Sequence, residues 1–530
     1  MTHLHLHTSY GFSWHNDVSE RLFVQGYCFD EQGYYYEGAE LLEYFSGIGS
    51  AEGFVRRITE ANGCFAVIWK AEDATFAAVD RLRSLPIVWK KASDGIHISG
   101  DVSQLGDSHT LDTAQAVVFP YSCLSLGAAT LFREVHQLQA GEWLHIQGRT
   151  TTVRTYFACT NEFDPSSPSE EEIRRQFRLT AEAVWTRLIQ ASRQRTFVIP
   201  LSGGYDSRLI AAMFRQLECE RVICFTYGRK SSNEVAISRQ VAEKLGYPWH
   251  FVEYTESLLK TYLEEDGLAY RDFASNGISV AHEQDFFAIR QLLLEGKIPV
   301  DAIVLPGFGG DVLAGSWFPD KVPASWSRDR FIRYLITNRK FFSGTRKPRL
   351  DKKAIYQMIS KEIPVEAIPD LPTAYSLLQY WGMRNRMSKF LVNAVRVYDF
   401  WGLHWKLPFF DHEWIDYWRG IPDVYKLNKR LYLSEASQWL FQPMGIDFHM
   451  DVPRPSVFRK FAKQLLPAVI VDELKARWVD RVPVDVNNQD TLSRLICEEQ
   501  GWDEERLKRV DLNYLMGSAY IRKLTDAFGL

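Results

Sequence analysis

The sequence predicts an α/β protein in which a β-rich N-terminal domain precedes a domain built on a parallel sheet. Three observations support this fold class. Short alternating polar and apolar segments recur up to about residue 155, strands and helices alternate from residue 195, and the chain is mostly helical after about residue 328. At 530 residues the chain exceeds the ~250–300 residues at which a single core stops growing. We therefore expect at least two domains.

The composition is typical of a folded protein with a large core. Hydrophobic residues make up 46% of the chain and aromatic residues 14%, so extensive disorder is not expected. A formal charge of −4 gives no general attraction to nucleic acids or membranes. None of the seven cysteines has CxxC spacing, the N-terminus lacks a signal-peptide pattern, and no apolar run approaches the ~20 residues of a membrane helix. These features predict a cytoplasmic protein without disulfides, structural zinc or membrane spans.

The order of the predicted elements follows from these patterns. In the first domain, strands are expected at residues 3–10, 22–29, 63–70, 75–80, 87–91, 96–99 and 142–147, and a helix at 50–61. The polar segment 160–171 contains two prolines and separates two domains, which we place at residues 1–158 and 170–530. A long amphipathic helix with acidic residues in its first turn follows, up to about residue 193. Strands at 196–201, 222–227, 249–252 and 302–305 then alternate with helices at 207–217, 232–245 and 281–294, which predicts a parallel sheet with helices on its faces.

The segment between the first strand and first helix of this sheet has the composition of a phosphate-binding loop. It reads Leu201, Ser202, Gly203, Gly204, Tyr205, Asp206 and Ser207. Successive glycines let the backbone approach a phosphate closely, and the N-terminus of the following helix favours an anion. The serine hydroxyls add hydrogen-bond donors, and Asp206 is a hard oxygen ligand suited to Mg²⁺. The pattern GxxxxGK[ST] is absent, so this is not a Walker A loop.

This loop resembles the SGGxDS motif with which the N-type ATP pyrophosphatases bind the pyrophosphate of ATP. More closely, the region is similar to the synthetase domain of the asparagine synthetase family, which has an adenine-nucleotide α-hydrolase-like (PP-loop) fold. The resemblance implies ATP as a substrate, with Phe225 and Tyr227 on the strand that holds adenine and ribose. The helix at 234–246 is also similar to the E-x₃-A-x₂-V-A-x₂-L-G helix of that family.

A second acidic loop follows the strand at 302–305. Residues 306–311, which read PGFGGD, resemble the LSGEGSDE motif of asparagine synthetases, about one hundred residues after the first loop. The match makes Asp311 the second Mg²⁺ carboxylate and places Pro306 and Gly307 at the nucleotide. Loops at the carboxyl ends of strands in one parallel sheet border the same crevice. Asp206 and Asp311 are therefore expected to face each other.

One position departs from the family pattern. Phe308 stands where asparagine synthetases carry Glu and β-lactam synthetases carry a catalytic Tyr, and a phenyl ring can neither accept nor donate a proton. Asp399 and Glu283 are conceivable substitutes for the missing base. Family members also stabilise the departing pyrophosphate with a lysine from a basic loop. Arg454 is the first candidate for that role here, and Lys460 is the second.

The N-terminal domain resembles the glutaminase domain of asparagine synthetases. Its similarity is to the motifs DGxFAF, DRxGxxPLY and PAG-x-x-L, found here at residues 62–67, 80–87 and 140–144. This resemblance implies an Ntn-hydrolase-like fold. Glutamine hydrolysis in that domain needs an N-terminal cysteine whose α-amine is the base, but this chain begins with Met1 and Thr2. We expect a glutaminase fold that has lost hydrolysis, with Cys64 in its core and Thr2 as a formal alternative nucleophile.

The leading hypothesis is an ATP- and Mg²⁺-dependent synthetase that adenylates a carboxylate and transfers ammonia or an amine to it. Its expected partners are small molecules rather than nucleic acid or membranes, and a homodimer is left open. Two alternatives remain. An RNA-modifying enzyme could use the same loop to adenylate a base, and the basic stretch at 328–353, with interleaved aromatic residues, slightly favours it. A non-catalytic ATP-binding protein is consistent with Phe308 and the missing cysteine.

Overall fold

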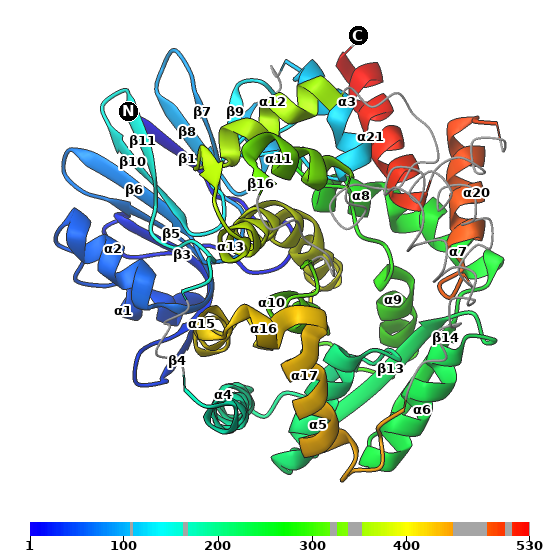
Figure 1. The fold of residues 1–530 in the computed structure, drawn as a ribbon. Helices are drawn as coiled ribbons and strands as arrows, with labels where there is room; N and C mark the ends of the chain where they lie inside the picture. Colours follow the sequence, from blue (N-terminus) through cyan, green and yellow to red (C-terminus); the bar gives the residue numbers. More distant parts are fainter. Residues whose placement is uncertain are drawn as a thin grey trace.

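The chain folds into a β-rich N-terminal region and an α/β C-terminal region (Figure 1). The computed structural model describes residues 1–106, 110–162, 168–318, 326–337, 352–448, 485–503 and 511–528. In Figure 1 the blue N-terminal strands and the green parallel sheet lie on opposite sides of the molecule, with yellow helices between them. Within the described ranges, no helix has the length and apolar character required to cross a bilayer. The α/β fold class predicted from the sequence is confirmed.

Two sheets form the N-terminal region, which we call the sandwich (residues 1–155). One sheet has the order β1 (Thr2–His5), β8 (Ile96–Ser99), β7 (Val88–Lys91) and β9 (Val135–Gln137). The other has the order β11 (Thr150–Thr155), β10 (Glu142–Gln147), β6 (Ala74–Val79), β5 (Asn62–Lys70), β3 (Leu22–Phe29) and β2 (His15–Asn16), with β4 (Tyr35–Glu37) beside β3. Every strand predicted in this region has a counterpart in these sheets.

The period of two along β5 explains how the larger sheet is buried on both faces. Ala66 and Ile68 belong to the main core cluster that includes residues of the smaller sheet. Phe65 and Val67 point to the opposite face and pack in a second cluster with Phe54 of α2 (Ala51–Glu60). Successive side chains of a strand alternate between faces, so one strand contributes to two layers.

Two helices of the sandwich were not predicted, the short α1 (Leu41–Tyr44) and the longer α3 (Thr113–Ser122). The helix α3 contains Pro120, and its sequence lacks an amphipathic period because apolar residues, among them the exposed Val117, stand on its solvent side as well as its buried side. It packs against α21 (Leu512–Phe528) near the end of the chain, and a Cβ added at Gly517 of α21 would lie 2.9 Å from the Cα of Pro120. Figure 1 shows the cyan and red helices side by side. The C-terminal helix therefore covers the sandwich.

The C-terminal region begins with α4 (Glu170–Gln190), which the sequence predicted, and continues into a parallel sheet. The sheet has the order β14 (Trp249–Glu253), β13 (Val222–Gly228), β12 (Phe197–Pro200), β15 (Ile303–Val304) and β18 (His404–Trp405). Four of these strands were predicted. The fifth, β18, was missed because it is only two residues long and lies among helices. All four strand pairings are parallel.

The strand order locates the functional end of this sheet. The first strand, β12, lies between β13 on one side and β15 on the other, so the chain reverses its direction of winding between β12 and β15. Ligands of open α/β sheets bind outside the carboxyl ends of the strands at such a switch point. The loops after β12 and β15 are the two loops singled out in the sequence. Each leads into a helix, α5 (Tyr205–Gln216) and α10 (Gly310–Leu313).

Helices dominate the rest of the chain, as predicted. Among the described residues they include α6 (Asn233–Leu245), α9 (Phe286–Leu294), α11 (Arg328–Thr337), α12 (Lys352–Glu362), α13 (Leu371–Gly382), α14 (Arg396–Phe400), α15 (His412–Gly420), α17 (Arg430–Glu435) and α20 (Gln489–Gln500).

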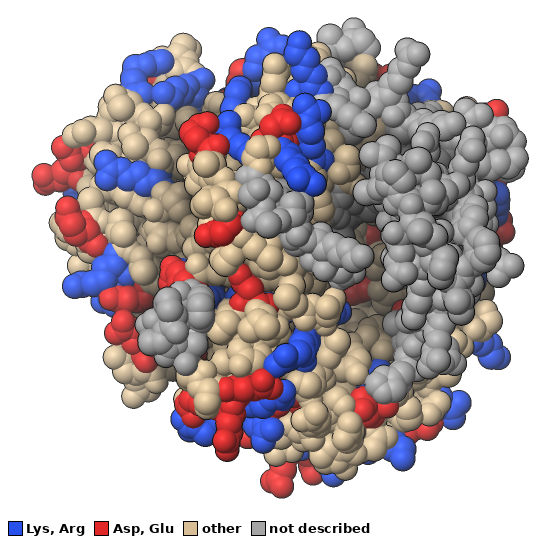
Figure 2. All heavy atoms as spheres, in the orientation of Figure 1, with Lys and Arg blue, Asp and Glu red and all other residues tan. Residues whose placement is uncertain are grey.

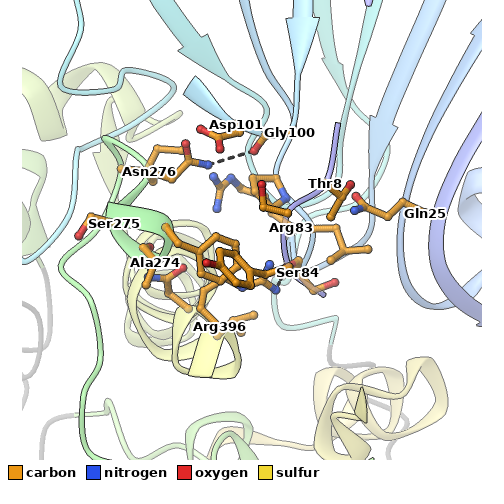
Figure 3. Close-up of a pocket in the computed structure, with 18 of the residues that line it drawn as sticks. Thr8, Gln25, Arg83, Ser84, Gly100, Asp101, Ala274, Ser275, Asn276 and Arg396 are labelled. Atoms are coloured by element: carbon orange, nitrogen blue, oxygen red, sulfur yellow. Dashed lines mark hydrogen bonds between the residues drawn. The ribbon is translucent and has the colours of Figure 1, made fainter. Parts of the chain in front are cut away.

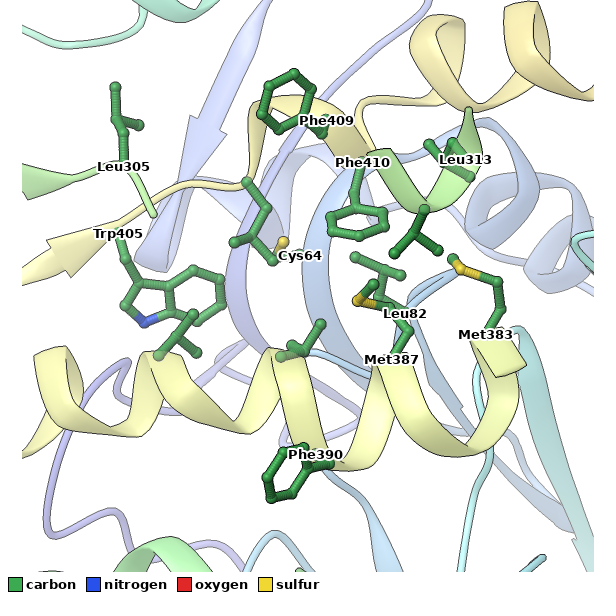
Figure 4. Packing of buried hydrophobic residues seen from close by; sticks show 14 of the residues in the cluster. Cys64, Leu82, Leu305, Leu313, Met383, Met387, Phe390, Trp405, Phe409 and Phe410 are labelled. Carbon is green, nitrogen blue, oxygen red and sulfur yellow. The ribbon is translucent and has the colours of Figure 1, made fainter. Parts of the chain in front are cut away.

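A continuous apolar core joins the sandwich to the C-terminal region. Cys64 and Leu82 of the sandwich belong to the same buried cluster as Met387 and Phe410 (Figure 4). Cys64 is 4% exposed, as expected of a core residue. Ion pairs cross the same junction, among them Arg195 with Glu37 at 2.7 Å and Arg384 with Glu142. The two regions are therefore held as one packed body at this junction.

Candidate active site

The first loop begins where β12 is fixed to β13. The Leu201 N–H donates to the Phe225 carbonyl at 2.8 Å, and the Leu201 carbonyl accepts from the Thr226 hydroxyl at 2.6 Å. Helix α5 starts at Tyr205, two residues before its predicted start, so Asp206 lies in the first turn of the helix. N–H groups in the first turn have no intrahelical partner and can bind an anion.

Hydroxyl groups and a buried arginine fix the shape of this loop. The Ser207 hydroxyl accepts from the Ser202 N–H at 3.0 Å, and the Ser202 hydroxyl accepts from the Gly204 N–H at 3.1 Å. Arg208 is fully buried and donates to the Gly203 carbonyl at 2.8 Å. Its other contacts include the carbonyl of Phe448 at 2.8 Å. Arg208 therefore ties the loop to the chain that follows α17, a role the sequence did not reveal.

The second loop packs directly on the first. A Cβ added at Gly307 would lie 2.6 Å from the backbone nitrogen of Ser207, so only glycine permits this approach. Gly309 has φ = 108°, a conformation that favours glycine, and it packs against the Phe410 ring. The glycines of the second loop thus allow the two loops to touch.

This packing brings Asp206 and Asp311 together. The Asp311 N–H donates to Asp206 Oδ2 at 3.2 Å, and the Tyr432 hydroxyl donates to Asp206 Oδ1 at 2.7 Å. Lys429 Nζ lies 3.4 Å from Asp311 Oδ2. Burial, and then the negative charge of Asp311, raise the pKa of Asp206 to about 7. The predicted juxtaposition of the two carboxylates is therefore present in the fold.

The carboxylate pair fits a divalent cation. Both side chains are partly exposed, and their oxygens are the hard ligands that Mg²⁺ prefers. The raised pKa of Asp206 shows that the positive charge of Lys429 does not fully offset the repulsion between the two carboxylates. A bound cation would add the missing positive charge. Asp206 and Asp311 are thus the residues that would hold Mg²⁺.

Lys429 and Tyr432 were not found by sequence reasoning. They lie more than 200 residues after Asp206, at the start of α17, in a segment without a motif. Asn428 and Lys429 both have left-handed backbone conformations, with φ of 55° and 57°. Two such residues in succession turn the chain sharply just before the helix. Because tertiary packing places this turn, no local pattern signals that it reaches the acidic pair.

The residues predicted to contact adenine and ribose lie in different environments. Phe225 is fully buried, and its carbonyl accepts from the Leu201 N–H. Tyr227 is half-buried and donates to Asp285 at 2.5 Å. Pro306 is buried, and Phe308 is half-buried and packs against the core.

The two conceivable substitute bases are held in ion pairs elsewhere. Asp399 pairs with Arg396 at 2.9 Å and accepts from the Trp405 indole N–H at 2.8 Å. Glu283 pairs with Arg271 at 2.7 Å. In the described part of the chain, neither carboxylate contacts Asp206 or Asp311. The candidates for the pyrophosphate contact, Arg454 and Lys460, lie outside the described residues.

The basic stretch is described only in part, because residues 338–351 lie outside the described ranges. Figure 2 shows lysine and arginine side chains gathered over α11 and α12. Some of this charge is already paired or bonded within the region. Arg333 forms an ion pair with Asp329 at 2.7 Å, and Arg328 donates to the Ile363 carbonyl at 3.3 Å. The nucleic-acid alternative remains a prediction.

One of three comparisons with known proteins identifies a family. The family model for asparagine synthase matches residues 178–516, more than half of the chain. Among curated proteins, none matches. The similar solved structures include a glutamine-dependent NAD⁺ synthetase from Acinetobacter baumannii, with 19% identity over 32% of this chain and 33% of that chain, and a TM-score of 0.21. An NH₃-dependent NAD synthetase from Campylobacter jejuni has 16% identity over 42% of this chain and 96% of that chain, also with a TM-score of 0.21.

A third similar structure is a glutamine phosphoribosylpyrophosphate amidotransferase from B. subtilis. It has 10% identity over 56% of this chain and 63% of that chain, with a TM-score of 0.19. This chain spans about a third of the Acinetobacter chain and less than two thirds of the B. subtilis chain. These likenesses are too distant to define the substrate.

Proposed function

Because the chain belongs to the asparagine synthase family, we propose that it is an ATP-dependent synthetase that forms an amide from a carboxylate and ammonia or an amine. The observation that supports this function most strongly is the pair Asp206 and Asp311. The pair lies at the switch point of a parallel sheet, beside a glycine-rich loop and the N-terminus of α5. This combination suits a nucleotide triphosphate with its cation.

The first loop would bind the β- and γ-phosphates of ATP. Its glycines allow close backbone approach, and the N-terminus of α5 supplies N–H donors. The hydroxyls of Ser202 and Ser207 face each other at 3.1 Å and are further donors. Asp206 and Asp311 would hold Mg²⁺, which neutralises charge on the phosphates when bound.

The reaction has two displacements. A substrate carboxylate oxygen attacks the α-phosphorus, the bond between that phosphorus and the β-phosphate oxygen breaks, and pyrophosphate leaves. The nitrogen of ammonia or an amine then attacks the acyl carbon, the bond to AMP breaks, and one proton is released from nitrogen. Phe308 cannot act as a base, so we propose that the nitrogen enters as the free base and that the proton released after its attack passes to the phosphate of the departing AMP or to water. Lys429, whose ammonium group lies beside Asp311, would stabilise the charge on the departing pyrophosphate.

Residues 1–158 and 170–530 are proposed as two domains, the first a glutaminase-like fold without glutaminase chemistry. Thr2 supports this view, because it lies within β1 and its hydroxyl accepts from the Thr75 hydroxyl at 3.3 Å. On this proposal the nitrogen comes from ammonia or an amine substrate, and the first domain serves as a packing partner.

Pyrophosphate release tests the proposal. The purified chain would be incubated with ATP, Mg²⁺ and a panel of carboxylates, with ammonium or small amines as nitrogen donors. We expect pyrophosphate and AMP in equal amounts with at least one carboxylate, and no product with Asp206→Asn. Asp301→Asn is the matched control, because Asp301 is an exposed acid at the start of the same strand-loop segment.

The alternatives give different results in the same assay. Pyrophosphate release that depends on bulk tRNA rather than on a small carboxylate would favour an RNA-modifying enzyme. ATP binding without turnover on any carboxylate would favour a non-catalytic protein.

A further inference from the structure

A cavity of about 80 Å³ lies at the junction between the sandwich and the C-terminal region. Its lining comes from the loop after β1, from the turn at Arg83, from the segment around Asn276 and from the helical segment that contains Arg396. Figure 3 shows the labelled side chains of these segments around one space. By the same kind of volume, one water needs roughly 10–15 Å³, so several waters or a small molecule fit.

A buried arginine without a partner lines this cavity. Arg83 is 5% exposed, and its Nε is buried without a hydrogen bond. Across the described ranges, its guanidinium has no ion-pair partner and donates no hydrogen bond to the protein. A charged group held out of water without a partner is costly. Most other arginines at this junction are paired, as Arg195 is with Glu37.

The backbone of Arg83 is also unfavourable for arginine. Arg83 has φ = 56°, a left-handed conformation that glycine adopts most readily. It stands at the glycine position of the DRxGxxPLY pattern that residues 80–87 resemble. Strain of this kind persists at sites where a side chain has a use beyond folding. Both the backbone and the burial of Arg83 therefore disfavour it, unless a ligand compensates.

The remaining charges near the cavity do not neutralise Arg83. Arg396 pairs with Asp399 at 2.9 Å and donates to the Ser84 carbonyl at 3.0 Å. Asp101 accepts from the Ser103 N–H at 2.8 Å and is not paired with Arg83 in the described part of the chain. Burial, and then the charge of Arg396, lower the pKa of Arg83 to about 9, while the charge of Asp80 acts in the opposite direction. The Asp80 carboxylate accepts from backbone N–H groups of its own loop and forms no ion pair with Arg83 among the described residues. Arg83 is still mostly protonated near pH 7, which leaves one unpaired positive charge.

We propose that this cavity binds a small carboxylate whose oxygens pair with the guanidinium of Arg83. A planar guanidinium presents two parallel N–H groups that match a carboxylate. A monoanion matches the single unpaired charge, whereas a phosphate dianion would leave an excess negative charge beside Asp101. The ligand would contact both regions and so tie the loop after β1 to the segment around Asn276. This site requires neither ATP nor the acidic pair.

Thermal unfolding of the full chain without nucleotide tests the site. Sodium acetate and sodium formate would be titrated against sodium chloride at equal ionic strength. We expect a saturable rise of roughly 1–3 °C in Tm for the wild-type chain with the carboxylates only. Arg83→Gly and Arg83→Gln should both lose this rise. Glycine suits the backbone at this position, and glutamine removes the charge while keeping a polar side chain.

Two controls identify where the carboxylate binds. Arg193→Gly removes another arginine with positive φ (53°), which is exposed and not part of the cavity, and it should keep the rise. Asp206→Asn should also keep it, because that residue belongs to the proposed ATP site. Loss in Asp206→Asn with retention in both Arg83 variants would assign the carboxylate to the synthetase site and overturn the proposal. No rise in the wild type, or a rise with phosphate alone, would also overturn it.

Discussion

Each of the two regions contains an aspartate with a raised pKa, and the two aspartates differ in what surrounds them. In the sandwich, burial raises the pKa of Asp80 to about 6. In the C-terminal region, burial and the charge of Asp311 raise the pKa of Asp206 to about 7. Asp80 is 1% exposed and accepts from the N–H groups of Phe65, Leu82 and Ser84 and from the Ser84 hydroxyl. Asp206 is partly exposed and lies beside a second carboxylate.

This difference distinguishes Asp80, which has a structural role, from Asp206, which has a proposed role in binding and catalysis. The Asp80 carboxylate accepts from Leu82 and Ser84 of its own turn and from Phe65 on β5, so it organises the loop that contains Arg83. Asp206 has a like-charged neighbour, and its protonation depends on what else enters the site. Asp80 therefore organises a loop of the sandwich, whereas Asp206 belongs to the proposed cation site.

The largest expected effect comes from neutralising the second acid. Asp311→Asn should reduce pyrophosphate release by about 10³-fold or more, because a cation ligand and its charge are lost. Steady-state release of pyrophosphate at saturating ATP would measure it. Activity within ten-fold of the wild type would remove Asp311 from the proposed cation site.

A smaller loss is expected at the lysine beside Asp311. Lys429→Met keeps much of the side-chain length but removes the charge, and we expect kcat to fall roughly 10²-fold. Single-turnover measurement of AMP formation would place the loss in the chemical step. A control lysine has to be exposed, which excludes the nearby Lys426, because it is buried and donates to Asn161 at 2.9 Å. The exposed Lys230 is preferable, and Lys230→Met should leave kcat unchanged.

The raised pKa of Asp206 predicts that stability falls as pH rises towards 7 without Mg²⁺, whereas the stabilisation by Mg²⁺ grows over the same range. Because the folded pKa is above the ordinary carboxyl value, the Asp206 contribution favours folding at low pH and is lost as pH rises towards about 7. Mg²⁺ must displace the proton, so its apparent affinity should fall up to ~10-fold per pH unit below pH 7. Tm recorded from pH 5 to 8 with and without Mg²⁺ and an ATP analogue would show it. A Mg²⁺-dependent shift that is constant over this range would contradict the titration.

The smallest catalytic effect is expected at the structural acid. Asp80→Asn turns one acceptor oxygen into a donor facing N–H groups, which should cost about 1–3 kcal/mol of stability. Per folded molecule, the rate of pyrophosphate release should stay within a few-fold of the wild type. Denaturant unfolding and activity on the same preparation separate the two readouts. An activity loss as large as that of Asp311→Asn would erase the distinction between the two acids.

Much of the C-terminal region was predictable because its elements are local and regular. The loop at 201–207 and the loop at 306–311 each follow a strand that the sequence predicts. Their motifs, and the approach of the two loops at one edge of the sheet, could therefore be inferred from the sequence. Two-residue β18 was not predictable, because a strand of that length has no period. The contribution of Lys429 and Tyr432 was also hidden, since it depends on a left-handed turn at 428–429 and on packing across more than 200 residues.

The sandwich shows a different limit of sequence reasoning. Alternation predicted the strands β1, β3, β5, β6, β7, β8 and β10 but not β2, β4, β9 and β11. The helix α3 was missed as well, because apolar residues lie on most sides of it. The environment of Arg83 was equally hidden. A sequence shows an arginine at a glycine position, but only the fold shows that this arginine is buried near Arg396 and forms no ion pair within the described ranges.

The most direct test of the acidic pair is Mn²⁺ binding followed by electron paramagnetic resonance, in the presence of a non-hydrolysable ATP analogue. The wild-type chain and Asp80→Asn should each bind nucleotide-dependent Mn²⁺, whereas Asp206→Asn should not. Undiminished nucleotide-dependent Mn²⁺ binding by Asp206→Asn would contradict the account.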